Sequence, residues 1–165
     1  MSISNGIDSR YLTSLGLDVV SFDLSDRMLE EARKLDADGR YVKLDLRDVA
    51  SLGQTFSGVF ASGCLYHLQR DEFASFVNDI YELLEPEGVF YLSMKIGMGE
   101  EYRAVPSDRY PDGEQARQLL QGDRYYVYYQ RDELTPYLRR YQRLHERELQ
   151  HAEEIVEIGL QKLLP

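Results

Sequence analysis

The stretch DVVSFDLSDRMLEEARKL, residues 18–35, decides the fold class of this chain. Its first six residues are rich in β-branched and aromatic types and predict a buried strand over 18–23, which ends on the carboxylate of Asp23. Ser25 is a suitable N-cap for a helix over 26–35, and acidic residues in its first turns suit the helix dipole. A strand that ends on an acid and leads directly into a helix is typical of doubly wound folds that bind nucleotides.

The same alternation of strand and helix continues along the chain. Further helices are predicted over 8–15 and 71–84, and further strands over 40–45, 57–62, 89–95 and 125–129. This order predicts a parallel sheet with helices on both faces. The segment 97–124 is rich in glycine and proline, and it predicts a long lid beside the strand ends.

The end of the chain carries a pattern that predicts one long helix. Thr135 and Pro136 suit a helix start, and from there to Leu164 the only breaker is Gly159. The apolar residues form a stripe at helical spacing: Tyr137, Tyr141, Leu144, Ala152, Ile155, Val156, Leu160 and Leu163. We therefore expect an α/β domain over 1–135 and a C-terminal helical extension over 136–165. This helix would either cap the body of the protein or dock on another subunit.

The composition excludes several classes of function. The net charge of −10 argues against nucleic acid as a partner, because binding the phosphate backbone needs a positive field. Cys64 is the only cysteine, so no intrachain disulfide can form, and a reducing compartment such as the cytoplasm is expected. No apolar run approaches the length of about 20 residues that a membrane span needs. No metal site is expected.

Four stretches together resemble the class I S-adenosylmethionine-dependent methyltransferases that act on small molecules. They are DSRYLTSLGLDVVSFDLSDRMLEEAR, YVKLDLRDV, GVFASGCLYHL and IYELLEPEGVFYLSMK, in the family's order and spacing. The resemblance runs from about Asp8 to Leu138 and implies a Rossmann-like doubly wound sheet, the methyltransferase fold. It also implies S-adenosyl-L-methionine as the cofactor and a small-molecule methyl acceptor.

The resemblance places the adenosine part of the cofactor at two strand ends. Asp23 matches the acid that accepts hydrogen bonds from both ribose hydroxyls, and Leu24 and Met28 match the apolar residues on either side of the adenine. Asp45 matches the acid that reaches the adenine amino group, with the backbone of Leu46 close to the ring. The alternative for Asp23 is a capping or solvated loop acid, and for Met28 it is simple core packing.

The remaining matched positions lie toward the reacting end of the cofactor. Ala61 and Ser62 match the strand end whose backbone meets the methionine part. His67 matches a position that faces the methyl-transfer site, where an imidazole can act as a general base. Tyr66 is the second candidate catalytic residue, and like His67 it could instead be a packed structural residue. The alternative for His67 is a packed, hydrogen-bonded structural histidine. Lys95 either meets an anionic acceptor or is a solvated lysine at a strand end.

The family's first strand and its glycine-rich turn have no clear counterpart here. The turn would be SISNG, residues 2–6, in which Gly6 is the only glycine available to approach the methionine carboxylate. The family's first strand occupies the middle of the sheet, so its loss leaves unpaired edges on two neighbours and removes a wall of the pocket. We expect a fold truncated at this strand, and an isolated monomer that does not bind the cofactor tightly.

Two main classes of function therefore remain open, and a sensor of a nucleotide or nucleoside is a weaker third. The chain is either a methyltransferase-like protein, active alone or in an assembly that supplies the missing strand, or a non-catalytic scaffold or regulatory subunit that has lost cofactor binding. In both cases we expect a homo-oligomer or a partner chain, in contact through the C-terminal helix or the open sheet edge.

Overall fold

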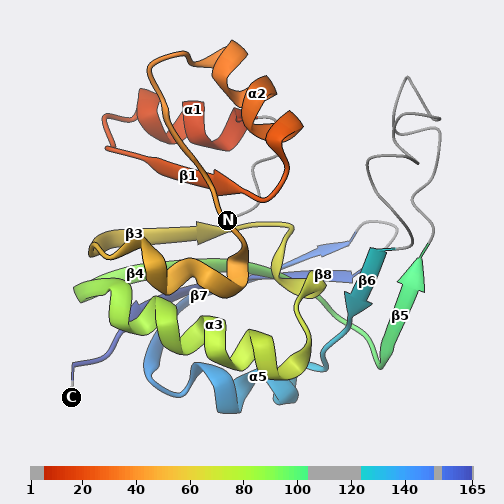
Figure 1. Ribbon diagram of the computed structural model, residues 1–165. Helices are drawn as coiled ribbons and strands as arrows, with labels where there is room; N and C mark the ends of the chain where they lie inside the picture. The colour runs from red at the N-terminus through yellow and green to blue at the C-terminus, as the bar shows by residue number, and fades with distance from the viewer. Residues whose placement is uncertain (1–5, 104–123, 151–153, 165) are drawn as a thin grey trace.

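The computed structural model describes residues 6–103, 124–150 and 154–164, which form two lobes and a projecting hairpin (Figure 1). The N-terminal lobe consists of α1 (Ile7–Ser14), β1 (Val20–Asp23), α2 (Asp26–Leu35) and β2 (Arg40–Lys43). The main lobe consists of η1 (Leu46–Leu52), β3 (Phe56–Ala61), η2 (Leu65–His67), α3 (Arg70–Leu83), β4 (Leu84–Lys95), α5 (Arg131–Leu138), β7 (Tyr141–Gln150) and β8 (Glu154–Lys162). The hairpin consists of β5 (Glu100–Arg103) and β6 (Arg124–Val127).

The α/β sheet is divided between β1 and β3. β1 pairs with β2 in parallel, and β3 pairs in parallel with β4 in a sheet of order β3-β4-β8-β7. Within the described residues no strand lies between β1 and β3, although the two point the same way in Figure 1. Among the described residues two strand edges therefore face each other between the lobes, and the expected truncation of the fold stays a prediction.

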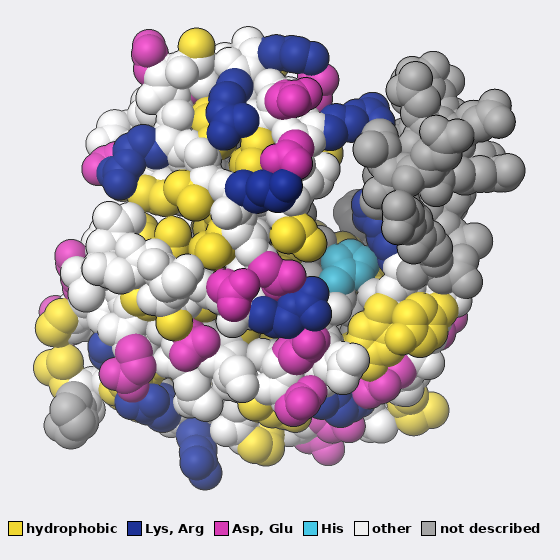
Figure 2. All heavy atoms as spheres, in the orientation of Figure 1, with side chains coloured by type: hydrophobic (Ala, Val, Ile, Leu, Met, Phe, Trp, Pro, Cys, Tyr) yellow, Lys and Arg dark blue, Asp and Glu magenta, His cyan; other side chains and the backbone are white. Residues whose placement is uncertain are grey.

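A cavity of about 420 Å³ lies between the two facing edges, and we call it the slot. Its lining is mostly apolar and comes from both lobes, including Leu17, Val20, Phe22, Val49, Val59 and Ile80. Figure 2 shows hydrophobic side chains along the boundary between the lobes. The strands of a parallel sheet are buried on both faces by apolar side chains. The apolar lining of the slot is of the same kind.

The core of the protein lies in the main lobe, where α3 and α5 cover one face of the four-stranded sheet (Figure 1). α3 buries Phe73, Phe76, Val77 and Ile80, which recur at the spacing of one helix face. Phe76 packs against Phe90 of β4, with ring centroids 6.3 Å apart. The helix predicted over 71–84 is thus confirmed with a shift of one residue.

The long helix expected over 136–165 is wrong. α5 ends at Leu138, and the chain continues as the antiparallel hairpin β7–β8, whose second strand pairs with β4. In β8 the buried residues Val156, Ile158 and Leu160 alternate with less buried ones, which is the period of a strand. The described part of the C-terminal segment therefore joins the sheet as two strands and forms no helix after Leu138.

The other predicted elements need smaller corrections. α5 begins at Arg131 because Gln130 and Glu133 form a capping box, so Pro136 lies inside the helix and does not start it. The expected lid over 97–124 contains β5, and its residues 104–123 lie outside the described part of the chain. Among the described residues no helix is both long and apolar enough to cross a lipid bilayer.

The β7–β8 hairpin predicts that replacing two leucines of the same apolar stripe destabilises the protein to different extents. Leu160 is 1% exposed and Leu144 is 52% exposed. We expect Leu160→Ala to lower the free energy of unfolding by about 2–5 kcal/mol, because it leaves a cavity in the core. Leu144→Ala should change it by no more than about 0.5 kcal/mol. Urea denaturation checks both variants, and equal losses would contradict the strand assignment.

Candidate active site at the carboxyl ends of the strands

The predicted site residues gather at one edge of the sheet. Asp23 ends β1, Ala61 ends β3 and Lys95 ends β4, while Asp45 follows the end of β2 by two residues. Because these four strands are paired in parallel within each lobe, and β1 and β3 point the same way, their carboxyl ends share that edge (Figure 1). In open α/β sheets this is the edge at which ligands bind.

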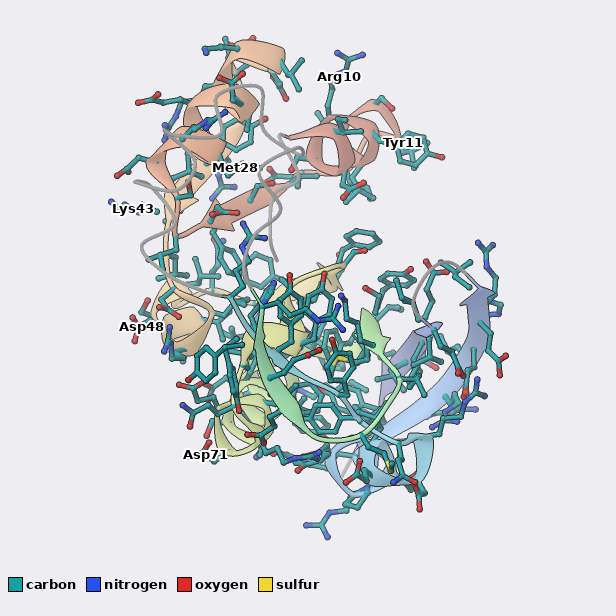
Figure 3. All side chains as sticks on the ribbon, turned by 90° about the vertical axis from the view of Figure 1, so that its right-hand side faces the viewer. Arg10, Tyr11, Met28, Lys43, Asp48 and Asp71 are labelled. Atoms are coloured by element: carbon teal, nitrogen blue, oxygen red, sulfur yellow. The ribbon has the colours of Figure 1, made fainter. Side chains whose placement is uncertain are left out.

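Asp23 is held in the turn between β1 and α2. Its Oδ1 accepts a hydrogen bond of 2.8 Å from the backbone N–H of Ser25, and the Ser25 hydroxyl in turn caps α2 by accepting from Met28 N at 3.4 Å. Met28 is half-buried on α2 (Figure 3), whereas Leu24 is 58% exposed. The predicted N-cap is confirmed, and Leu24 lies on the surface beside the turn.

Asp45 is held by several hydrogen bonds from Arg47. It caps η1 by accepting from Arg47 N at 2.9 Å, and the Arg47 guanidinium donates to both carboxylate oxygens, at 2.9 and 3.0 Å. This pairing holds the pKa of the Asp45 carboxyl below its usual range, so the group is a carboxylate at neutral pH. Arg47 also contacts Glu72 of α3 at 3.2 Å. Leu46, the first residue of η1, is half-buried beside this pair.

The turn after β3 is tied to the neighbouring strand β4. Ala61 is fully buried, and the hydroxyls of Ser62 and Ser93 lie 3.4 Å apart. The N–H of Gly63 donates to the Ser93 hydroxyl at 2.9 Å, and Gly63 has a φ of 71°. A glycine suits this left-handed turn, which fixes the path of the chain at the end of β3.

Tyr66, His67, Tyr126 and Lys95 form a compact group that we call the aromatic cluster. The rings of Tyr66 and Tyr126 are nearly parallel, with centroids 5.7 Å apart, and the His67 ring lies edge-on to each at 4.7 Å. The Lys95 ammonium lies 4.5 Å from the Tyr126 ring centroid and 4.9 Å from that of Tyr66. Two of these residues come from η2, one from β4 and one from β6.

A backbone contact fixes the tautomer of His67. Its Nδ1 lies 2.7 Å from the carbonyl oxygen of Tyr125, and because a carbonyl can only accept, Nδ1 must carry the proton. In the neutral ring Nε2 is then the atom that can take up a proton. Burial, with the positive charges of Arg124 and Lys95, lowers the pKa of His67 below its ordinary value. The ring is therefore neutral at physiological pH and suited to act as a base.

The sequence did not identify Tyr126 or Arg103 as site residues. YYVYY was interpreted as a tyrosine-rich strand, and the structure confirms β6 there. Only the pairing of β6 with β5 brings Arg103 within 5.6 Å of the Tyr126 ring. The adjacent tyrosines of β6 were the signal available, but they lie on opposite faces of the strand and do not indicate which face meets His67.

Gly6 has a structural role in the N-terminal lobe. It is the N-cap of α1 with a φ of 80°, and a Cβ there would lie 2.8 Å from the Cα of Ala32 in α2. The expected role in approaching a cofactor carboxylate stays a prediction. No group of three or more potential metal ligands occurs among the residues that the structure describes.

Comparisons with known proteins identify a family for part of the chain. A family model described as "Methyltransferase domain" matches residues 2–88. The malonyl-[acyl-carrier protein] O-methyltransferase of Enterobacter lignolyticus is 32% identical over 81 residues, which make up 49% of this chain and 32% of that protein. The matched region thus spans about a third of the length of this curated relative.

Solved structures share the fold at low sequence identity. A SAM-dependent methyltransferase from Methanosarcina mazei superposes with a TM-score of 0.79 at 14% identity, covering 99% of this chain and 91% of that one. The 1,6-didemethyltoxoflavin-N1-methyltransferase of Burkholderia thailandensis, solved with bound 1,6-didemethyltoxoflavin and S-adenosylhomocysteine, gives a TM-score of 0.71 at 20% identity, covering 98% of this chain and 68% of that one.

The packing around Gly6 predicts a specific loss of stability. Gly6→Ala places a methyl group against Ala32 and also strains the backbone, whereas Gly16→Ala strains the backbone alone because nothing lies within 4 Å of its Cβ. We expect Gly16→Ala to cost about 1–2 kcal/mol. Gly6→Ala should cost about 1–3 kcal/mol more, as overpacked sites do. Thermal denaturation of both variants measures these losses of stability. Equal losses would show that α1 and α2 do not pack closely at Gly6.

The charges around His67 predict a change in its titration. Arg124→Gln removes a positive neighbour, so the pKa of His67 should rise, because the protonated ring is then less disfavoured. The ring proton signals of His67 in an NMR pH titration measure this shift. The control Arg139→Gln, at the exposed end of α5, should leave it unchanged. A fall in the pKa, or no change, would contradict the geometry.

Proposed function

The chain belongs to the class I S-adenosylmethionine-dependent methyltransferase family, and from this membership we propose that it binds the cofactor at the carboxyl ends of β1–β4 and serves methyl transfer to a small-molecule acceptor. The observation that carries the proposal is the placement of Asp23, Asp45 and His67 at one edge of the sheet. Two anchored carboxylates and one base-competent imidazole supply the groups that such a site needs.

The adenosine half of the cofactor fits the residues present. A carboxylate offers about four acceptor positions, so the Asp23 group, oriented by Ser25 N, suits a pair of neighbouring hydroxyls. Half-buried Met28 supplies an apolar surface for a purine ring on the same side of the turn. Asp45, held by Arg47, is a hydrogen-bond acceptor next to Leu46. The exocyclic amino group of the adenine is a donor that could bind it.

The methionine half fits less completely. The matched region contains a single glycine between residues 2 and 6, where the family uses a glycine-rich turn, and Gly6 packs on α2. The slot lies between the two lobes that hold the adenosine and methyl-transfer sides. Binding would therefore depend on how firmly the lobes are held together, and we propose an affinity weaker than in a continuous sheet.

When bound, the cofactor supplies an electrophilic methyl group, and the residues of the chain do the rest. His67 takes the proton of the acceptor's hydroxyl or amine on Nε2, while the Tyr125 carbonyl holds Nδ1–H and so fixes the ring. Tyr66 packs at the edge of this ring and limits its rotation. The residues would thus contribute to catalysis by positioning the acceptor and by removing its proton.

The slot supports a second candidate function. β1 and β3 each present an edge with no strand partner among the described residues, and the space between them is lined by apolar side chains. Such edges accept an extended peptide by strand addition. We propose as this alternative a scaffold or regulatory subunit that receives a strand from a second copy or another chain, with or without cofactor binding.

Binding of S-adenosylhomocysteine to the full chain tests the leading function. We expect micromolar binding by calorimetry, about −8 kcal/mol, and a loss of about tenfold or more in Asp23→Asn, because the amide replaces a charged acceptor. The control Asp26→Asn alters an exposed carboxylate that pairs with Lys43 and should bind as the wild type. Equal affinity in Asp23→Asn would remove Asp23 from the site. No binding by folded wild-type protein at millimolar ligand would favour the second candidate.

A further inference from the structure

The β5–β6 hairpin supplies the group that orients His67, but it is a small unit. Its two strands have four residues each and pair with one another among the described residues. A two-stranded hairpin is only marginally stable in water without further contacts. Backbone hydrogen bonds join Tyr129, just after β6, to Lys95 and Gly97 at the base of the hairpin. The contact between His67 and the Tyr125 carbonyl therefore depends on which side chains fix the rest of the hairpin to the main lobe.

Arg70, the first residue of α3, makes four contacts around this base. Its Nη2 donates to the Tyr128 carbonyl oxygen at 3.0 Å, and its guanidinium carbon lies 4.5 Å from the ring centroid of Tyr129. Its Nε lies 3.5 Å from Oε1 of Glu100 on β5, and its Nη1 lies 3.4 Å from Oε1 of Glu133 on α5. A planar guanidinium can make such contacts together because its donors point in fixed directions, which a lysine ammonium cannot reproduce.

Glu100 extends the contacts of Arg70 to Tyr125. Its Oε2 accepts a hydrogen bond of 2.5 Å from the Tyr125 hydroxyl, while its Oε1 faces Arg70. Desolvation and the hydrogen bond to Glu100 raise the pKa of Tyr125 to about 12, so the hydroxyl keeps its proton at neutral pH. The backbone carbonyl of the same tyrosine accepts from Nδ1 of His67. A continuous series of contacts thus runs from Arg70 through Glu100 and Tyr125 to the proposed base.

The backbone of the main lobe closes this series into a loop. Arg70 follows His67 by three residues, and the capping box of Gln69 and Glu72 fixes the start of α3. Phe73, one turn further along α3, is fully buried in the core. His67 and Arg70 therefore lie on one short stretch of the main lobe, and each of them contacts the hairpin or the residues that directly follow it.

We propose that Arg70 is a positioning residue for the proposed base: it fixes the β5–β6 hairpin so that the Tyr125 carbonyl keeps the proton of neutral His67 on Nδ1. This inference rests on the proposed function, because it assigns Arg70 a part in the proton transfer from the methyl acceptor to Nε2. Arg70 acts through Glu100 and Tyr125 and not by touching the acceptor. Without its guanidinium the hairpin shifts away from η2, and the His67 ring exchanges between its two tautomers.

NMR spectra of the His67 ring nitrogens in the full chain at neutral pH test this role. In the wild type we expect one tautomer, with its proton on Nδ1. Arg70→Gln should populate the Nε2–H tautomer and speed the exchange of the Nδ1 proton with water about tenfold or more, the effect of one lost hydrogen bond. The control Arg131→Gln removes the first residue of α5, whose ion pairs are with the β7–β8 hairpin, and should leave the His67 signals unchanged.

Two milder variants separate positioning from a general loss of stability. Glu100→Gln weakens the ion pair of Arg70 on the hairpin side, and Glu133→Gln weakens the ion pair on α5 while a glutamine preserves the capping box of that helix. We expect Glu100→Gln to change the tautomer in the same direction as Arg70→Gln, and Glu133→Gln to leave it unchanged. If Arg70→Gln does not fold, this pair of variants decides alone.

A wild-type tautomer in Arg70→Gln and Glu100→Gln, or an equal change in Glu133→Gln, would overturn the proposal. Calorimetric titration of the same samples with S-adenosylhomocysteine separates it from the proposed function. If Arg70→Gln changes the tautomer but the wild type does not bind S-adenosylhomocysteine, the positioning of His67 by Arg70 stands and the cofactor function fails. If the wild type binds and Arg70→Gln keeps the tautomer, the positioning role fails and the cofactor function stands.

Discussion

The division of the sheet between β1 and β3 is the constraint on which the rest of this structure depends. Parallel strands gain their stability from hydrogen bonds on both edges and from helices on both faces. Here β3 is stabilised by β4, α3 and the hairpin β7–β8, while β1 pairs with β2 among the described residues and contributes Phe22 to the core of the main lobe. The slot between them is apolar, so the lobes lie on either side of a space that water solvates poorly.

This division separates the two halves of the candidate site. Asp23 and Met28 belong to the N-terminal lobe, which Figure 1 shows as a separate group of elements and in which Figure 3 labels Met28. Ser62 and the aromatic cluster belong to the main lobe and to the β5–β6 hairpin. Any ligand that spans both halves binds only as well as the lobes are held together. A strand bound in the slot would hold the two lobes in a fixed arrangement. Strand addition should therefore increase the affinity for a cofactor that contacts both lobes, and cofactor binding should favour strand addition in the same way.

Local signals in the sequence predicted the local structure well. The helix over 26–35 has the same bounds in the structure because Ser25 and the following acids fix its start. The C-terminal hairpin was missed because the apolar residues from Ile155 to Leu160 satisfy a helical period and an alternating one. Pairing with β4, a strand about 65 residues earlier, decides between them, and no local pattern encodes that contact. The same holds for Tyr126, which only the β5–β6 pairing brings to His67.

Residue-resolved amide hydrogen exchange of the protein alone tests the divided sheet most directly. In a parallel strand alternate amides face opposite neighbours. We expect alternate amides of β1 and β3 to exchange faster than those of β4, because among the described residues no strand on the slot side accepts their hydrogen bonds, while amides along β4 are protected by β3 and β8. Uniform protection along β1 and β3, equal to that of β4, would contradict the account and show that the two lobes share one continuous sheet.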